Sequence, residues 1–149
     1  RRLGLLGAPL LAVMCVIGYQ MAIEAGRSGF TPDPAKVSAL SFMAIPLFDL
    51  GIFATLVAAA LWLRRRLDWH KRFMLIATLS LLPPALARVA FQFPPTPALP
   101  VAFGGTALIV LAAIALDSVA QRRLHPAMLC SGLLVLDRIE RFQRKYRWA

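Results

Sequence analysis

The chain has 149 residues, of which 59% are hydrophobic and 16% are charged, and its mean hydropathy is +0.68. A soluble domain of this size could not bury so much apolar surface, so the composition excludes an ordinary soluble fold. The net charge of +10 could suggest nucleic acid, but the 17 basic residues gather at the ends of apolar runs and do not form one stripe. That distribution is typical of a membrane protein, and we expect no nucleic-acid partner.

The first two apolar runs predict a pair of crossing helices. Residues 3–23 contain no charge, and this length meets the roughly 20 residues needed to cross a ~30 Å hydrocarbon core. A loop rich in glycine and proline is expected at residues 24–36. The second run, residues 37–63, contains Asp49 as its one charge. Pro46 should bend this helix because proline removes a backbone hydrogen bond.

A strongly basic segment, residues 64–72, separates the second apolar run from the third, which covers residues 73–93. Side chains this charged do not lie in hydrocarbon, and basic loops of bacterial inner membranes stay on the cytoplasmic side. We therefore predict a cytoplasmic loop at 64–72, in which Asp68 caps the third helix. The Pro-Pro pair at residues 83–84 should kink that helix, and Arg88 is its one charge.

Proline and charge also delimit the rest of the chain. A tight, proline-rich connection is expected at residues 94–100, followed by a fourth helix at 101–120 and a second basic loop at 121–125. The basic residues divide by side in agreement with this topology. The inner cations are Arg1, Arg2, Arg64, Arg65, Arg66, Lys71, Arg72, Arg122 and Arg123, and those of the outer half are Arg27, Lys36 and Arg88.

The last segment permits two interpretations. Pro126 is well placed as the first residue of a fifth helix, but residues 126–136 provide only half of a span before a charged tail at 137–149. Asp137 with Arg141 and Glu140 with Arg144 have the i,i+4 spacing of helical ion pairs. The helix could cross with its charges neutralised against the bundle. Alternatively, it could enter shallowly and finish as a basic amphipathic segment on anionic lipid.

Together these segments predict an all-α fold. We expect a polytopic transmembrane helical bundle at residues 1–136, with four crossing helices and a fifth, partly amphipathic C-terminal helix, followed by the basic tail at 137–149. The chain begins with Arg1 and not with Met, so we expect a processed product or a piece of a longer protein. Whether further helices precede it stays open.

Four short stretches carry a resemblance to known proteins. They read Pro-Leu-Phe-Asp at 46–49, Trp-His-Lys-Arg-Phe-Met at 69–74, Leu-Pro-Pro-Ala-Leu-Ala-Arg at 82–88 and Arg-Leu-His-Pro-Ala at 123–127. They resemble a family of uncharacterised bacterial multi-pass inner-membrane proteins, which is distantly similar to small membrane proteins of oxidase assembly. The likeness covers most of residues 1–135, and the tail departs from it. In that family further helices precede the opening Arg-Arg-Leu-Gly. The resemblance implies a membrane protein and carries no settled activity.

Asp49 and Arg88 form the first candidate site. Each is the one charge within its apolar run, and adjacent antiparallel helices could bring them together. A lone charge in the bilayer costs several kcal/mol, so we expect an intramembrane ion pair. A proton or substrate relay is the functional alternative, and Glu24 is a rival partner for Arg88 near the same boundary.

His70 and His125 form the second candidate site, because each lies at the inner start of a helix. Two imidazoles on one side of the membrane could ligate haem b or a metal ion, with Asp117 as a nearby acceptor. The competing interpretation is ordinary interfacial histidine, since the flanking cations disfavour another positive ion and the spacing matches no ligand motif. No cofactor is expected on balance.

The sequence contains no pair of nucleophile and base, no phosphate-binding loop and no paired carboxylates, so nothing in it supports an enzyme. We therefore expect a non-catalytic accessory or assembly subunit of a larger respiratory or photosynthetic membrane complex in the bacterial inner membrane. Its partners would be other membrane subunits, further copies of itself and lipids, including anionic lipids. The alternatives are a haem b-binding redox protein and a small transporter.

Overall fold

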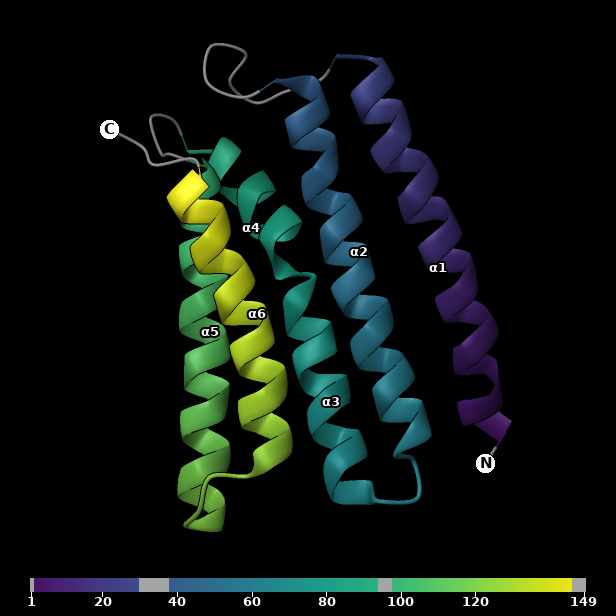
Figure 1. The fold of residues 1–149 in the computed structure, drawn as a ribbon, viewed down its shortest axis with the longest axis vertical. Helices are drawn as coiled ribbons and strands as arrows, with labels where there is room; N and C mark the ends of the chain where they lie inside the picture. Colours follow the sequence, from purple (N-terminus) through teal and green to yellow (C-terminus); the bar gives the residue numbers. More distant parts are fainter. Residues whose placement is uncertain (1, 30–37, 94–97, 146–149) are drawn as a thin grey trace. The chain divides into compact units, whose positions relative to one another are not determined.

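The computed structural model describes residues 2–29, 38–93 and 98–145. The expected loop at 24–36 lies partly outside these ranges, the proline-rich connection at 94–100 lies largely outside them, and Arg1 and residues 146–149 lie wholly outside. The described residues form helices joined by short turns and contain no strand, which confirms the all-α prediction. The helices are α1 (Arg2–Arg27), α2 (Ala39–Trp62), α3 (Leu67–Ser80), α4 (Leu82–Phe91), α5 (Ala98–Gln121) and α6 (Pro126–Lys145) (Figure 1).

Four described segments are long and apolar enough to cross a membrane, as predicted. They are Pro9–Arg27, Met43–Trp62, Leu67–Phe91 and Pro100–Gln121. The third combines α3 with α4. The sixth helix is not among them, because its second half is charged. The chain is therefore a membrane protein with four candidate spans and a further, partly polar helix.

The double proline breaks the third span and does not merely bend it. α3 ends at Ser80 and α4 begins at Leu82. Between them, the backbone N–H of Leu81 donates a hydrogen bond to the carbonyl of Thr78 at 3.2 Å. Proline at position 84 has no N–H to donate, and its ring would clash with the carbonyl of Ser80. The predicted kink thus takes the form of an interruption between two short helices.

The first basic loop is shorter than predicted. α3 begins at Leu67, so only residues 63–66 connect it to α2. The prediction that Asp68 caps the helix is wrong: Arg66 is the N-cap residue, without a side-chain cap bond. Asp68 lies in the first turn, where negative charge is favoured, and its carboxylate is 2.9 Å from the Lys71 ammonium. This turn is therefore helical although it is strongly charged.

The chain divides into two compact units, Arg1–Ala54 and Thr55–Ala149. In the first unit, α1 packs on the beginning of α2 through small residues one turn apart. A Cβ at Gly26 would lie 2.5 Å from the Met43 sulfur, and one at Gly18 would lie 3.4 Å from a Leu50 methyl. Ala22, between them, is buried. The small residues of α1 thus leave room for the Met43 and Leu50 side chains of α2.

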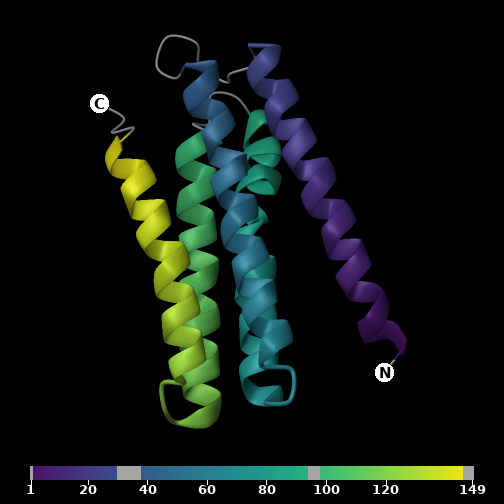
Figure 2. The same ribbon diagram turned by 45° about the vertical axis from the view of Figure 1, so that its right-hand side comes forward.

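The second unit is a bundle in which α5 packs against α4 and α6, and α3 packs against α6 and α5 (Figures 1 and 2). α6 runs antiparallel to α5: Gly132 faces Ile114 and Val110, and the rings of Phe142 and Phe103 are 4.4 Å apart. The buried face of α6 is formed by residues at helical spacing. These are Ala127, Met128, Ser131, Val135 and Ile139.

The packing of α6 bears on the two interpretations of the C-terminal segment. α6 is one continuous helix from Pro126 to Lys145, and it contacts α5 as far along as Phe142. Its charged half does not leave the bundle within the described residues. The charged side chains, however, are exposed and pair within α6, not against the bundle, so the membrane path of this helix stays a prediction.

Candidate functional site

Four helix ends meet at one end of the second unit: the C-termini of α2 and α5 and the N-termini of α3 and α6 (Figure 1). We call this the basic end, because exposed cations surround it. They are Arg64, Arg65, Arg66, Lys71, Arg122 and Arg123. Exposed apolar side chains alternate with them, among them Trp62, Leu67 and Leu124. Mixed cationic and aromatic side chains of this kind are typical of a membrane interface.

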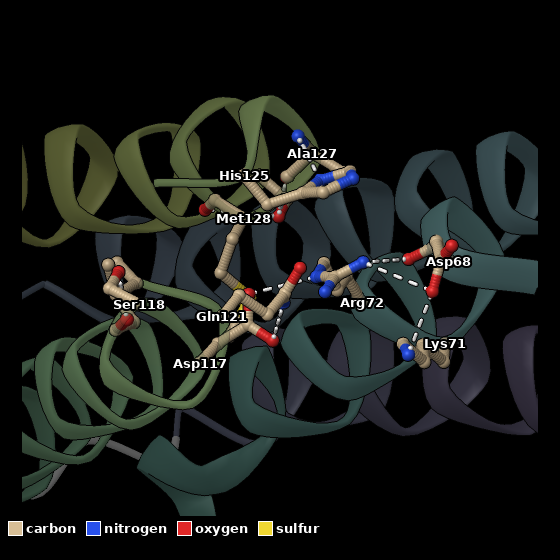
Figure 3. Close-up of polar contacts among 11 residues, drawn as sticks. Asp68, Lys71, Arg72, Asp117, Ser118, Gln121, His125, Ala127 and Met128 are labelled. Atoms are coloured by element: carbon tan, nitrogen blue, oxygen red, sulfur yellow. Dashed lines mark hydrogen bonds and ion pairs between the residues drawn. The ribbon is translucent and has the colours of Figure 1, made fainter. Parts of the chain in front are cut away.

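Arg72 and Asp117 form a buried ion pair at the basic end (Figure 3). The Arg72 Nε donates to Asp117 Oδ2 at 2.9 Å, and the Arg72 side chain is only 3% exposed. Its Nη1 donates to the backbone carbonyl of Asp68 at 2.7 Å, and Gln121 donates to the other Asp117 oxygen at 2.7 Å. Both charges therefore have partners, as burial requires.

This pair joins the beginning of α3 to the end of α5, which are 45 positions apart along the chain. Removing one partner of a buried pair typically costs about 3–5 kcal/mol, because the other charge is left without compensation. The chemistry of the arrangement is consequently structural: it fixes how α3 and α5 are rotated about their axes at the basic end.

His125 begins α6. Its Nδ1 accepts a hydrogen bond from the backbone N–H of Ala127 at 3.2 Å, which satisfies one of the unpaired donors at the helix start. Pro126 follows as the first helical residue, as predicted. The His125 ring also meets the edge of Trp69, with centroids 5.4 Å apart. Because Nδ1 is an acceptor, the proton of the neutral ring is on Nε2.

His70, in the first turn of α3, forms a hydrogen bond with the C-terminal end of α2. Its Nδ1 is 2.7 Å from the backbone carbonyl of Ala60, one of the carbonyls that the last turn of a helix leaves unpaired. Since a carbonyl only accepts, the Nδ1 of His70 carries the proton and donates it. The two histidines thus use the same ring nitrogen in opposite roles, and each closes the end of a helix.

The predicted haem or metal role of His70 and His125 stays a prediction. Both rings have Nδ1 engaged and Nε2 outside these hydrogen bonds, an arrangement that also orients ligating histidines. Within residues 2–29, 38–93 and 98–145, no three His, Cys, Asp or Glu side chains form a group that could hold a metal ion. Asp117, predicted as an acceptor near the histidines, instead binds Arg72 and Gln121.

The predicted ion pair of Asp49 and Arg88 also stays a prediction. Asp49 is 5% exposed and belongs to the first unit, whereas Arg88 is exposed in the last turn of α4, in the second. Arg88 there complements the negative end of the helix dipole. The rival partner, Glu24, is exposed near the end of α1.

A second set of charges lies on the face of α6 that points away from the bundle. The Arg141 Nε is 2.8 Å from Asp137, and the Arg144 Nε donates to Glu140 at 3.1 Å. All four side chains are more than half exposed. Apolar residues precede these charges on the same face. We call the whole set the exposed face of α6, and its residues are Cys130, Leu133, Leu134, Asp137, Glu140, Arg141 and Arg144.

The packing of α6 determines the depth of these charges. Asp137 lies between Gly132, which faces Val110, and Phe142, which faces Phe103. It is therefore level with the first half of the candidate span Pro100–Gln121, and the other three charges lie nearer the start of that span. The cost of a charge in lipid falls from about 2.5–3.5 kcal/mol at the bilayer centre toward the interface. Bare lipid is thus an unfavourable neighbour for this face.

Sequence reasoning missed the Arg72–Asp117 pair, although a signal was present. Arg72 lies near the start of the third span and Asp117 near the end of the fourth, so antiparallel helices bring both to one level. The charge pattern alone assigns Arg72 to the basic loop, and Asp117 is predicted only as an acceptor near the histidines.

No protein-family model, curated protein or solved structure matches the chain.

Proposed function

We propose that this chain is a non-catalytic integral membrane protein that serves as an accessory or assembly subunit of a larger respiratory or photosynthetic membrane complex. The exposed face of α6 carries this proposal. It presents Asp137, Glu140 and Arg141 beside an apolar span, where lipid solvates charge poorly. A neighbouring protein surface with polar groups is the environment that suits such a face.

The basic end supports a defined orientation within that role. Its cations and the exposed Trp62 suit the cytoplasmic surface of a bacterial inner membrane, where anionic lipid headgroups attract basic residues by about 1 kcal/mol each. Single cysteines introduced at Leu67 and Ser28, both exposed, test this. An impermeant maleimide should label position 67 only after the cytoplasmic side is opened, and position 28 before. Labelling of both from one side would contradict the topology.

Purification tests the proposal itself. The chain, tagged and expressed from its own promoter, is extracted in mild detergent and analysed by native mass spectrometry. We expect other integral membrane subunits in a constant stoichiometric ratio. A variant with Asp137→Lys and Glu140→Lys, which keeps the bundle core unchanged, should lose them. A chain that purifies without other subunits contradicts the proposal.

Haem binding is the second candidate function, and one observation favours it. His70 and His125 both have their rings oriented through Nδ1, with Nε2 outside those bonds. An absorption spectrum after haem-replete expression tests this candidate. A Soret band that is lost in both His70→Ala and His125→Ala would support ligation, and the absence of a Soret band in the unaltered protein would remove it.

A further inference from the structure

The basic end carries positive charge that the chain itself does not neutralise. The carboxylates at this end are already engaged: Asp68 is 2.9 Å from the Lys71 ammonium, and Asp117 binds Arg72 and Gln121. Among the described residues, no carboxylate pairs with the exposed arginines of the two turns. These arginines are Arg64, Arg65, Arg66, Arg122 and Arg123. An anion from outside the chain can therefore bind them without displacing an internal partner.

The five arginines form two groups on neighbouring turns. Residues 64–66 precede α3, and residues 122 and 123 precede α6. The backbone N–H of Trp69 donates to the carbonyl of Arg66 at 3.0 Å, and the Trp69 ring meets the His125 ring with centroids 5.4 Å apart. The buried ion pair between α3 and α5 holds the same elements together (Figure 3). The two arginine groups thus border one surface of the second unit.

The chemistry of this surface matches a phospholipid. The planar guanidinium of arginine presents a fork of donors that fits phosphate oxygens. The turns begin where candidate spans end, at Trp62 and Gln121, so their arginines lie at the level of lipid headgroups. Exposed apolar side chains stand beside them, namely Trp62, Leu67 and Leu124. Phosphate and acyl chains of one lipid therefore find suitable partners at the same place.

We propose that the basic end binds one phospholipid that carries two phosphate groups, with one phosphate on each arginine group. A lipid with a single phosphate neutralises one group and leaves the other without an anion. When two phosphates are joined covalently, the second contact becomes intramolecular and gains from a high effective concentration. The lipid then links the turn before α3 to the turn before α6. This inference goes beyond the accessory role and does not depend on it, because it requires only a chain embedded in a membrane.

A comparison of two lipids provides the first test. The full chain, purified in detergent and freed of native lipid, is mixed with diphosphatidylglycerol, which has two phosphates, or with phosphatidylglycerol, which has one, at equal phosphate concentration. Native mass spectrometry should show one bound diphosphatidylglycerol per chain and on the order of tenfold less bound phosphatidylglycerol. Equal binding of the two lipids, or no bound lipid, overturns the proposal.

Inorganic pyrophosphate distinguishes a lipid from a soluble anion. It also carries two phosphates but has no acyl chains for the apolar side chains beside the arginines. At the same phosphate concentration it should leave the bound diphosphatidylglycerol in place. Displacement of the lipid by pyrophosphate would show that the surface recognises soluble phosphate, and the proposal of a lipid partner would be wrong.

Arginine variants provide the second test. Three variants each replace two exposed arginines by glutamine, so they change the net charge equally, and Arg66 stays because it is the N-cap residue of α3. They are Arg64→Gln with Arg65→Gln, Arg122→Gln with Arg123→Gln and, as a control on α6, Arg141→Gln with Arg144→Gln. Either turn variant should bind diphosphatidylglycerol on the order of tenfold more weakly and lose its preference over phosphatidylglycerol. The control should retain both.

The unfolding midpoint of each variant without lipid shows whether it folds, and the comparison of the two lipids on the unaltered chain needs no variant. A folded turn variant that keeps the preference for two phosphates contradicts the proposal, as does a control that loses it. The result is separate from the proposed function. A chain that binds the lipid but purifies without other subunits contradicts only the accessory role. A chain that co-purifies with subunits but does not distinguish the two lipids contradicts only this inference.

Discussion

Two ion pairs of the second unit have almost the same geometry and different surroundings. The arginine Nε is 2.9 Å from a carboxylate oxygen in the pair of Arg72 with Asp117, and 2.8 Å in the pair of Arg141 with Asp137. The Arg72 side chain is 3% exposed, whereas the Arg141 side chain is 79% exposed. The first joins two helices, whereas the second joins neighbours on one helix. Distance alone therefore does not determine what an ion pair stabilises.

Burial gives each pair its role. The Arg72–Asp117 pair lies inside one copy, so it holds α3 on α5 whether or not a partner is present. The pairs on α6 contribute little to the isolated unit, because exposed i,i+4 pairs are typically worth about 0.3–0.5 kcal/mol. They become important only when a second surface removes them from water or lipid. The basic end thus stabilises the fold, and in the proposed function the exposed face of α6 serves association.

The largest expected effect comes from breaking the buried pair. Asp117→Ala should destabilise the detergent-solubilised protein by about 3–5 kcal/mol, because the buried Arg72 keeps only the more distant Asp68 carboxylate, 3.8 Å from its Nη1. Thermal unfolding followed by circular dichroism measures this. The double change of Arg72→Met with Asp117→Leu should recover most of the loss, since it removes both charges and fills similar volume. Equal losses in the single and double variants would mean that the pair does not hold these helices.

A second large effect is expected if Asp49 and Arg88 neutralise one another. Asp49→Ala and Arg88→Ala should each cost on the order of 3 kcal/mol, and the double variant should cost less than the sum of the two. A double-mutant cycle by thermal unfolding gives the coupling. Strict additivity would show that the two residues do not meet, and Glu24 would be the next partner to test for Arg88.

A smaller effect is expected at the start of α6. His125→Ala removes the acceptor for the Ala127 N–H and should cost about 1 kcal/mol, the usual value of an N-cap. His125→Asn supplies an equivalent acceptor and should restore stability, apart from the contact of the imidazole with Trp69. Unfolding midpoints of the two variants measure the difference. If Asn is no better than Ala, the capping bond contributes nothing.

The smallest effect is expected on the exposed face of α6. In detergent, at a dilution where the chain is monomeric, Asp137→Asn should cost less than about 1 kcal/mol, because an exposed pair is screened by solvent. The same variant should lower the amount of other membrane subunits that co-purify from native membranes. Comparing its unfolding midpoint with that of Asp117→Ala sharpens the contrast. A loss equal to that of Asp117→Ala in the monomer would mean that the pair is buried within one copy.

The helices themselves could be predicted because hydropathy is a local property. The fourth apolar run was expected at residues 101–120, and α5 covers Ala98–Gln121. The break at the double proline was visible for the same reason: the clash concerns only residues within one turn. The start of α3 was not predicted correctly, because a run of charges suggested a loop. Its Asp68–Lys71 pair lets that turn remain helical.

The candidate sites depend on rotation and partners, which a single sequence does not provide. The sequence shows that Arg72 and Asp117 occur at one level, but not that they point toward each other. It shows His70 beside basic residues, but not that the ring reaches the carbonyl of Ala60 in the preceding helix. For α6, composition suggested a short span and a separate tail, whereas contacts such as Phe103 with Phe142 come from packing.

The most direct test of the account is the environment of the exposed face of α6 in a bilayer. A spin label replaces Leu133 in a chain without other cysteines, and a matched label replaces Leu10 of α1, since the two side chains are 60% and 61% exposed. Power saturation with oxygen and with a water-soluble nickel complex then measures contact with lipid and with water. We predict that the label at position 133 is shielded from collisions with both reagents, whereas the label at position 10 is relaxed by collisions with oxygen. Oxygen contact at position 133 equal to that at position 10, or strong contact with the nickel complex, would contradict a protein partner on α6.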